Sequence, residues 1–481
     1  MPRRTFVSKA LVLTAGVVGV ASVAGAQMTQ PPAPGPLRPY AFPTVEQFAL
    51  PNGLKVILVE KHTLPEVEGR LILDAGAMRE PAAKNGLASL TGSLLSEGTG
   101  TMTGAEVARA MDALGAQYFT TANFNAAISD VVALKTVFPQ ALSLAAKMVI
   151  APSFPTSEVG RVKNQILAAY QQSHARTAGL ASDAFVRAAF DSTAPFSRPA
   201  SGTPATLGPL TRDDVINWHR TMYSPSAATL LLVGDINRAE AQSIAQQAYG
   251  TWQASAVTRA AVENPTRASS GTRVILVDRP GSVQSSIVVG QPGFRATDPD
   301  YLTMVALNHV LGGGFSSRIN MNLREKHGYT YGAFSGLDIR PGGGAFRITS
   351  DVRTSSTDSA LVEAVNEYKR IATEDVPGTE LTGMVNNLVS SFPNAVQTVQ
   401  GLAGRMQQLI IWGLPLDFYT TYRERLAAVT PADLRTVASS KLTPNNVIVV
   451  VAGDLSKIEA PIRARNLGSV EVWDANGNKV R

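Results

Sequence analysis

The chain of 481 residues is 44% hydrophobic and 17% charged, which excludes a disordered protein and suggests two or more globular domains. It has no cysteine, and this excludes disulfide bonds, thiolate nucleophiles and cysteine-ligated metal sites. The formal net charge is +6, but the basic residues form no stripe, so no nucleic-acid partner is expected.

The N-terminal segment is predicted to be an export signal. Arg3 and Arg4 precede a weakly apolar run over residues 10–25, and small residues form a cleavage site after Ala26. The run is too short and too rich in Ala, Gly and Ser for a membrane span, and no later segment is suitable, so stable membrane insertion is not expected. We expect a periplasmic protein. The start resembles a twin-arginine signal; an ordinary secretory signal with two incidental arginines is the alternative.

The mature chain contains a duplication. Lys55–Glu60 reads like Arg273–Asp278 at an offset of 218, and Val233–Asp235 reads like Ala452–Asp454 at an offset of 219. Three further identities keep the second offset: Thr211, Asp214 and Pro225 match Thr430, Asp433 and Pro444. Separated matches at one spacing predict two copies of one domain.

Six segments follow from this duplication and from the composition of the stretches around it. They are a signal peptide (1–26), an arm with six prolines (27–43), an N-terminal domain (44–253), a linker rich in Ser, Thr, Ala and Pro (254–271), a C-terminal domain (272–467) and a tail (468–481). We expect the arm to be extended and the tail to be loose.

Both copies are predicted to mix strands and helices. Runs of β-branched and apolar residues predict strands over 55–60, 68–74, 229–233, 273–278, 286–290 and 447–451. Apolar residues at helical spacing predict helices over 106–114, 138–148 and 157–172. Strands and helices do not alternate as in a parallel fold. The expected fold class is therefore α+β, with two homologous domains, each a mostly antiparallel sheet with helices packed on one face.

Two stretches of the first copy frame a further predicted helix, with leucines 87, 90 and 94 on its buried side. They read Asp74-Ala-Gly-Ala-Met-Arg-Glu-Pro81 and Gly86-Leu-Ala-Ser-Leu-Thr-Gly-Ser-Leu-Leu-Ser-Glu-Gly-Thr99. This frame resembles the zinc helix of the pitrilysin/insulinase family of zinc peptidases, and the resemblance extends over residues 42–467. The family carries the motif His-x-x-Glu-His there, in which the histidines bind zinc and the glutamate activates water.

The residues that the family uses for zinc are replaced in this chain. The motif positions hold Ser89, Gly92 and Ser93, and the glutamate expected near Ala169 or Tyr170 is absent as well. Serine hydroxyls are weak neutral ligands, and glycine cannot act as a base. None of the five histidines has ligand spacing: His62, His174, His219, His309 and His327. We therefore expect no metal and no other cofactor in this chain.

The second copy contains Leu311-Gly-Gly-Gly-Phe-Ser-Ser-Arg-Ile319 followed by Leu323-Arg-Glu-Lys-His-Gly-Tyr-Thr-Tyr-Gly332. This stretch resembles the family's second-domain signature, whose arginine and tyrosine map onto Arg324 and Tyr331. The resemblance implies that Arg324 binds substrate carbonyls and that the Tyr331 hydroxyl helps hold the oxyanion. The alternatives are an ion pair of Arg324 with Glu325 and an ordinary strand aromatic at Tyr331. The glycines are predicted to end a helix and begin a loop, for which substrate gating is the alternative.

Family resemblance also suggests a division of labour, because some members place the zinc motif and the Arg/Tyr pair on two different subunits. We expect this chain to be the non-zinc, substrate-binding and catalysis-supporting subunit of a heterodimeric zinc metallopeptidase. Its partners would be a zinc-bearing homologous subunit and an extended peptide, added as a strand to a sheet edge. The alternative is a non-enzymatic peptidase-like scaffold or peptide-binding protein. A stand-alone metallopeptidase would need a ligand set that the sequence lacks.

Overall fold

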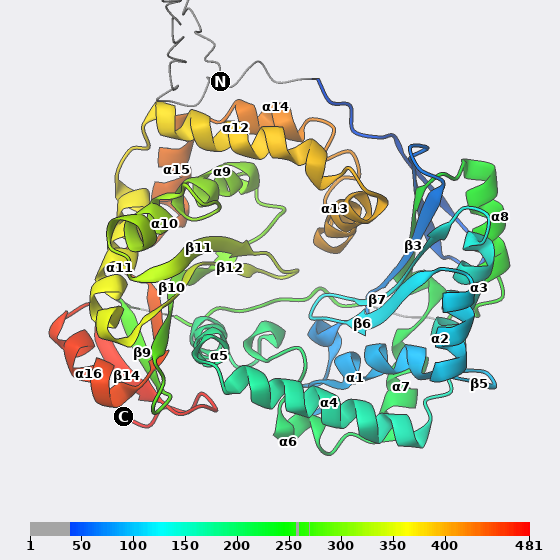
Figure 1. Cartoon of the computed structure of the whole chain (residues 1–481), viewed down its shortest axis with the longest axis horizontal. Coiled ribbons are helices and arrows are strands. Elements are labelled where there is room, and N and C mark those ends of the chain that lie inside the picture. Colours follow the sequence, from blue (N-terminus) through cyan, green and yellow to red (C-terminus); the bar gives the residue numbers. More distant parts are fainter. Residues whose placement is uncertain (1–38, 256–258, 269) are drawn as a thin grey trace, which may run out of the picture. The chain divides into compact units, whose positions relative to one another are not determined.

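Two six-stranded sheets form the framework of the computed structural model, which describes residues 39–255, 259–268 and 270–481 (Figure 1). The first sheet has the order β1 (Val45–Ala49), β2 (Lys55–Glu60), β8 (Ala228–Gly234), β3 (Glu66–Leu73), β7 (Ala127–Leu134) and β6 (Gln117–Ala122). The second has the order β14 (Ser469–Trp473), β9 (Arg273–Asp278), β13 (Ile448–Gly453), β10 (Gln284–Phe294), β12 (Gly344–Arg353) and β11 (Thr330–Asp338). The predicted signal peptide lies outside the described residues.

Five strands match in order between the two sheets: β2, β8, β3, β7 and β6 correspond to β9, β13, β10, β12 and β11. The remaining outer strands differ, because β1 pairs antiparallel with β2 and β14 pairs in parallel with β9. In both, the outermost hairpin (β6–β7, β11–β12) is antiparallel, and the central strand (β8, β13) pairs in parallel with the first long strand of its own half. The central strands are almost continuous apolar runs because they are buried on both faces. The predicted α+β class, with two homologous and mostly antiparallel sheets, is confirmed.

Helices complete each half, and the first half also contains a small hairpin, β4–β5. The first half contains α1 (Leu87–Leu94), β4 (Gly98–Thr99), β5 (Met102–Thr103), α2 (Gly104–Ala113), α3 (Phe138–Ile150), α4 (Thr156–His174), α5 (Thr177–Ala189), α6 (Pro204–Leu207), α7 (Arg212–Met222) and α8 (Arg238–Tyr249). The second contains α9 (Tyr301–Leu311), α10 (Arg318–Asn320), α11 (Thr357–Thr373), α12 (Gly378–Ala395), α13 (Val399–Trp412), α14 (Tyr422–Ala427), α15 (Pro431–Lys441) and α16 (Leu455–Ala464). Within the described ranges, no helix combines the length and the apolar character needed to cross a bilayer.

One helix of each half packs against the sheet of the other half. α5 contacts β10 and β13, while α13 contacts β3 and β8 (Figure 1). Phe185 of α5 belongs to the same buried cluster as Val288 and Val450 of the second sheet, and Leu402 of α13 clusters with Leu231 of the first. Each sheet has one face that the helices of its own half leave uncovered. The helix from the other half, α5 or α13, covers that face.

Two of the repeated identities mark the start of a helix. Thr211 and Asp214 form a capping box at the start of α7, and Thr430 and Asp433 form the same box at the start of α15. In each, the hydroxyl accepts from the backbone N–H of the aspartate at 3.2 Å, and the carboxylate accepts from the backbone N–H of the threonine at 2.9 Å. Such reciprocal bonds satisfy amides that the helix itself leaves unpaired.

The prediction of a loose tail is wrong for part of residues 468–481. β14 pairs in parallel with β9, and its Val472 and Trp473 are buried. Without β14, β9 would be an open sheet edge. The end of the proline-rich arm is also held, since Tyr40 and Phe42 pack against Phe392. The remaining domain boundaries, including the linker, stay predictions.

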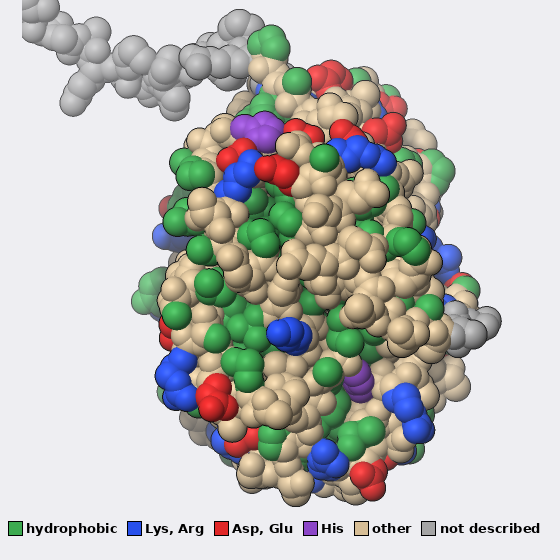
Figure 2. Space-filling view, turned by 90° about the vertical axis from the view of Figure 1, so that its right-hand side faces the viewer, with side chains coloured by type: hydrophobic (Ala, Val, Ile, Leu, Met, Phe, Trp, Pro, Cys, Tyr) green, Lys and Arg blue, Asp and Glu red, His purple; other side chains and the backbone are tan. Residues whose placement is uncertain are grey.

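Charged side chains are interspersed on the face of the first half that carries α3 and α8. Figure 2 shows this face, where Lys and Arg side chains lie among Asp and Glu toward the top and the bottom of the view, largely uncharged surface lies between them, and no basic patch gathers.

Candidate functional site

Helix α1 carries the three positions at which the family motif would place zinc ligands and base. Its leucines 87, 90 and 94 are buried, as predicted, while Ser89 and Ser93 are half-buried and Gly92 is buried. Among the described residues, no three His, Asp or Glu side chains are grouped so that they could hold a metal ion. The residues present on α1 do not fit a zinc ion.

Gly92 lies against the edge strand β6. A Cβ atom at this position would come within 2.5 Å of the backbone nitrogen of Ala122 and of the carbonyl carbon of Thr121. No real Cβ atom approaches a backbone that closely, so any side chain at residue 92 would force α1 away from β6. The position that the family motif assigns to the catalytic base is therefore the contact point between a helix and a strand.

The N-terminus of α1 is held by Glu80, a buried residue outside the helix. Its carboxylate accepts hydrogen bonds from the backbone N–H groups of Ala88 and Gly86 and from the side-chain amide of Asn85. Burial raises the pKa of the Glu80 carboxyl to about 7, against the opposing effect of these bonds and of the Arg198 guanidinium. This carboxyl replaces a capping side chain, because the cap residue Gly86 has a φ of 101° and no side chain.

The place predicted for a third ligand, on α4, holds an aromatic stack. Tyr170 lies 3.9 Å from the His174 ring, centre to centre, and His174 Nε2 lies 2.9 Å from the Asp183 carboxylate of α5. The other histidines are also engaged: His62 with Asp235, His219 with the carbonyl of Val149, His309 with Asn387 and His327 in a stack on Tyr329. These contacts agree with separate structural roles for the histidines.

Arg324 lies in a π-helical turn, Met321–Lys326, that follows α10. Its side chain is 40% exposed, its Nε lies 3.2 Å from Glu325 Oε1, and its guanidinium carbon lies 4.7 Å from the centre of the Phe315 ring. The alternative ion pair with Glu325 is therefore formed. An exposed pair of this kind contributes little and leaves guanidinium donors for a ligand. Turns of this type are frequent at functional sites.

Tyr331 lies on the edge strand β11 with 91% of its surface exposed. An ordinary strand aromatic would be packed, so the exposure favours a role in contact with a ligand. Three large hydrophobic residues are exposed as well: Phe315 in the loop after α9, Met321 in the π-helical turn and Phe334 on β11. The turn and β11 contact each other. Together with Arg324 these residues form a surface that we call the aromatic edge: Phe315, Met321, Arg324, Tyr331 and Phe334.

Three backbone donors of β11 are already occupied. The N–H groups of Gly332, Ala333 and Ser335 donate to Thr330 Oγ1, Asn320 Oδ1 and the carbonyl of Gly312 at 3.0, 3.2 and 3.0 Å. A peptide carbonyl that approaches this edge would find its donors in side chains, of which Arg324 and Tyr331 are exposed. The structure brings these two residues onto contacting elements, whereas α1 contacts β6, α4 and α7.

The triple glycine follows the end of α9, as predicted. α9 ends at Leu311, and the backbone of Gly312 lies directly against Ser335 of β11. Gly313 lies over His309, so a Cβ atom there would come within 2.7 Å of His309 Nδ1. Glycine is needed here because the loop packs tightly on both a strand and a helix.

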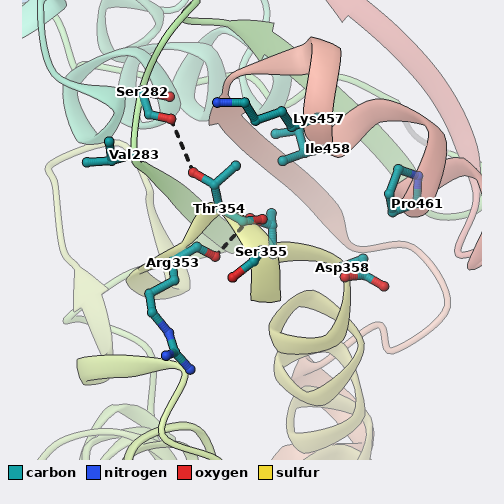
Figure 3. Close-up of a pocket in the computed structure, with 10 residues that line it drawn as sticks. Ser282, Val283, Arg353, Thr354, Ser355, Asp358, Lys457, Ile458 and Pro461 are labelled. Atoms are coloured by element: carbon teal, nitrogen blue, oxygen red, sulfur yellow. Dashed lines mark hydrogen bonds between the residues drawn. The ribbon is translucent and has the colours of Figure 1, made fainter.

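A cavity of about 560 Å³ opens at the start of α11, beside α16 (Figure 3). Two cationic side chains line it but point apart: Lys457 pairs with Asp454 at 3.1 Å, and Arg353 donates to the carbonyl of Gly328 at 3.0 Å. With both cations engaged elsewhere, the cavity does not assemble an anion site. The residues of chemical interest remain those of the aromatic edge.

Sequence reasoning missed Asn320, Glu80 and Phe315. Asn320 and Glu80 are polar residues that are completely or almost completely buried, and burial of a single polar side chain leaves no periodic signal. Phe315 was within the quoted signature, but its stacking on Arg324 depends on the path of the glycine loop.

Comparisons with known proteins agree with these features. The family model described as Insulinase (Peptidase family M16) matches residues 55–200, and that described as Peptidase M16 inactive domain matches residues 209–388. An uncharacterised zinc protease of Streptomyces coelicolor is 25% identical over 412 residues, which cover 83% of this chain and 87% of the relative. A non-peptidase homologue of Helicobacter pylori is 22% identical over 410 residues, covering 84% and 92%.

Solved structures give the same result. The crystal structure of a peptidase M16 inactive domain from Pseudomonas fluorescens matches with a TM-score of 0.80 and 27% identity, over 85% of this chain and 98% of that chain. A protease from Helicobacter pylori, with a TM-score of 0.78, 18% identity and coverage of 85% and 100%, shares the fold. With matched ranges over more than half of its length, the chain belongs to the insulinase, or pitrilysin, family of M16 peptidases, and it has lost the family's zinc ligands on α1.

Proposed function

We propose that this chain is the zinc-free, substrate-handling subunit of a two-subunit metallopeptidase that degrades extended peptides. The observation that carries the proposal is the aromatic edge, where Arg324 and the exposed Tyr331 lie on contacting elements. Helix α1 of the same chain has no residues that could bind zinc. A surface of donors and exposed rings without a metal of its own supports a role completed by another subunit.

The proposed division of chemistry follows from the donors on each side. Zinc in a homologous partner subunit would polarise the scissile carbonyl and activate water. Arg324 would donate to backbone carbonyls of the peptide, and the Tyr331 hydroxyl would donate to the oxygen that becomes negative during attack. Both groups are exposed, so a peptide reaches them without rearrangement of the core.

Strand addition is proposed at β6 rather than at β11. β6 is the outer strand of the first sheet, and its Gln117 and Phe119 are exposed. Along β11 an added strand would have to displace Asn320 and Gly312 from the backbone donors that they occupy. We therefore expect recognition through β-strand pairing at β6 and recognition through side chains at the aromatic edge.

The test is co-expression with a zinc-bearing homologue from the same source, followed by measurement of complex formation and of peptide cleavage. Arg324→Ala and Tyr331→Phe should leave assembly intact and reduce cleavage. Arg463→Ala is the matched control, because this arginine is 42% exposed and pairs with the neighbouring Glu459 but lies on α16. Full activity in both site variants would overturn the proposal.

A second candidate is a peptidase-like scaffold or peptide-binding protein without a share in catalysis. The pairing of Arg324 with Glu325 favours it, as does the similarity to the Helicobacter pylori relative, a non-peptidase homologue. This candidate predicts stable complexes with peptide or partner, no cleavage in any mixture, and tolerance of both substitutions.

We also propose that the protein is exported to the periplasm and that cleavage after Ala26 releases it. The support is the arginine pair, the apolar run and the small residues before Gln27. N-terminal sequencing of the protein from a periplasmic extract should begin at Gln27. Recovery of the full-length chain from the cytoplasm alone would contradict the proposal.

A further inference from the structure

Asn320 connects the three segments that carry the aromatic edge: the glycine loop (residues 312–315), the π-helical turn and β11. It is the last residue of α10 and has no exposed surface. Its Nδ2 donates to the carbonyl of Phe315 at 2.7 Å, and its Oδ1 accepts from the backbone N–H of Ala333 at 3.2 Å. One buried amide thus binds the glycine loop at one end and β11 at the other, so both functions of the amide are used.

The hydrogen bond from Asn320 to the Phe315 carbonyl affects the position of Arg324. Phe315 is exposed and is not fixed by core packing, yet its ring lies 4.7 Å from the Arg324 guanidinium carbon. A cation over an aromatic face is attracted by the ring and is held in a defined orientation. The backbone hydrogen bond from Asn320 therefore supports the ring on which the guanidinium rests.

The bond to Ala333 acts on Tyr331. The pairing of β11 with β12 is regular from Ala333 onward, but it shifts register between Thr330 and Ala333, which leaves Tyr331 and Gly332 unpaired. Such an irregularity re-aims a side chain away from the normal direction of the strand. The direction of Tyr331 thus depends on the point at which β11 returns to regular pairing, and Asn320 holds that point.

We propose that Asn320 is a positioning residue that sets Arg324 and Tyr331 relative to each other for the carbonyl groups of a bound peptide, with Phe315 as the support of Arg324. This inference rests on the proposed function. It adds that the relative orientation of Arg324 and Tyr331 is fixed within this chain before a partner binds. Asn320 fixes it through a side chain that never touches the peptide.

Asn322 provides a matched control on the same turn. Its Nδ2 donates to Glu363 and Glu367 of α11 at 2.9 and 2.8 Å, so it anchors the π-helical turn to the helix behind it. It has no bond to the glycine loop or to β11 among those of the described residues. Loss of Asn322 should lower thermal stability without changing the aim of Tyr331.

The experiment uses the complex with the zinc-bearing homologue and an internally quenched peptide. Asn320→Ala should lower kcat/KM about tenfold or more, because a small misplacement of donor groups is costly. Phe315→Leu should raise KM about two- to fivefold with kcat unchanged, and Phe315→Tyr should retain the wild-type KM. Asn322→Ala should leave the kcat of the folded complex unchanged, because the bonds of Asn322 do not reach β11 or Tyr331.

Asn320→Asp separates the two bonds, since a carboxylate still accepts from Ala333 but cannot donate to the Phe315 carbonyl. It should reproduce the KM of Phe315→Leu. In an Arg324→Ala background, Phe315→Leu should raise KM no further, because the ring acts through the guanidinium. This coupling distinguishes positioning from a general loss of stability.

The outcomes distinguish failure of the positioning role of Asn320 from failure of the proposed function. If Arg324→Ala and Tyr331→Phe impair cleavage while Asn320→Ala and Phe315→Leu do not, the positioning role is wrong and the proposed function stands. If none of these variants is impaired, the proposed function itself fails. If Asn320→Ala does not fold, wild-type KM values in both Asn320→Asp and Phe315→Leu, or additive effects in the Arg324→Ala background, overturn the positioning role.

Discussion

The corner where α1 meets β6 and the corner where the glycine loop and the π-helical turn meet β11 occupy matching places in the two sheets. In both, a glycine presses against the edge strand: Gly92 on β6 and Gly312 on β11. The first corner is closed to any side chain at residue 92 and holds small side chains where a zinc site would be. The second presents an arginine, a tyrosine and exposed rings. The duplicated frame thus has similar glycine packing in both copies, and it presents exposed donor side chains in only one.

The closed corner predicts that the zinc motif cannot be restored by substitution. Ser89→His, Gly92→Glu and Ser93→His together should lower the free energy of unfolding by about 3 kcal/mol or more, because a side chain at residue 92 collides with the β6 backbone. Thermal unfolding and zinc analysis check this. Ser89→His with Ser93→His alone is the control and should fold. A stable triple variant with one bound zinc would show that α1 is free to move.

The support of α1 by Glu80 predicts a pH-dependent stability. Because the pKa of this carboxyl is raised to about 7 in the folded chain, the folded state binds its proton more tightly than the unfolded state. Stability should therefore be greatest below about pH 4.5 for this group and fall by up to about 3 kcal/mol as pH rises to about 7.

Denaturant unfolding at several pH values measures this dependence. Glu80→Gln should be less stable at low pH, since glutamine accepts fewer bonds from Gly86 and Ala88, and its stability should change less across the same pH interval. An unchanged slope in the variant would assign the pH dependence to other groups.

The open corner predicts a loss of rate rather than of stability. Tyr331→Phe removes a hydroxyl that makes no packing contact in the core, so the melting temperature should hold while kcat of the assembled complex falls about a hundredfold. Stopped assays on complexes purified by size exclusion measure both quantities. If the melting temperature of Tyr331→Phe fell along with its kcat, Tyr331 would have a structural role.

The smallest effect is expected at Glu325. Glu325→Gln removes an exposed ion pair, so the free energy of unfolding should change by no more than about 0.5 kcal/mol. If the pair competes with peptide for Arg324, KM should also fall, by about twofold or less. A rise in KM would instead show that Glu325 helps to orient the guanidinium.

The strands and long helices were predictable because their signals are local. The apolar runs of β8 and β13 and the 3.6-residue spacing in α3 and α4 depend on the residues themselves. The packing of α5 and α13 on the sheet of the opposite half was not predictable, because the apolar face of a helix does not determine which sheet the helix will cover. β14 was missed because its position at the C-terminus, rather than its alternating residues, led to the prediction of a loose tail.

The candidate site was predictable as a set of residues but not as a geometry. Ser89, Gly92, Ser93, Arg324 and Tyr331 followed from the resemblance to the family. The contact of Gly92 with β6, the stacking of Phe315 on Arg324 and the occupied donors of β11 join residues that are distant in sequence. The first contact explains why α1 cannot carry the zinc motif, and the others explain why the β11 corner offers side chains, rather than its backbone, to a ligand.

The most direct test of the central claim is a titration of this chain into its purified zinc-bearing homologue while peptide cleavage is followed. Activity should rise and saturate at one copy of each subunit, and zinc should remain in the homologue. The Arg324→Ala, Tyr331→Phe double variant should bind without raising activity. Cleavage that is independent of this chain, or a double variant as effective as the wild type, would contradict the central claim.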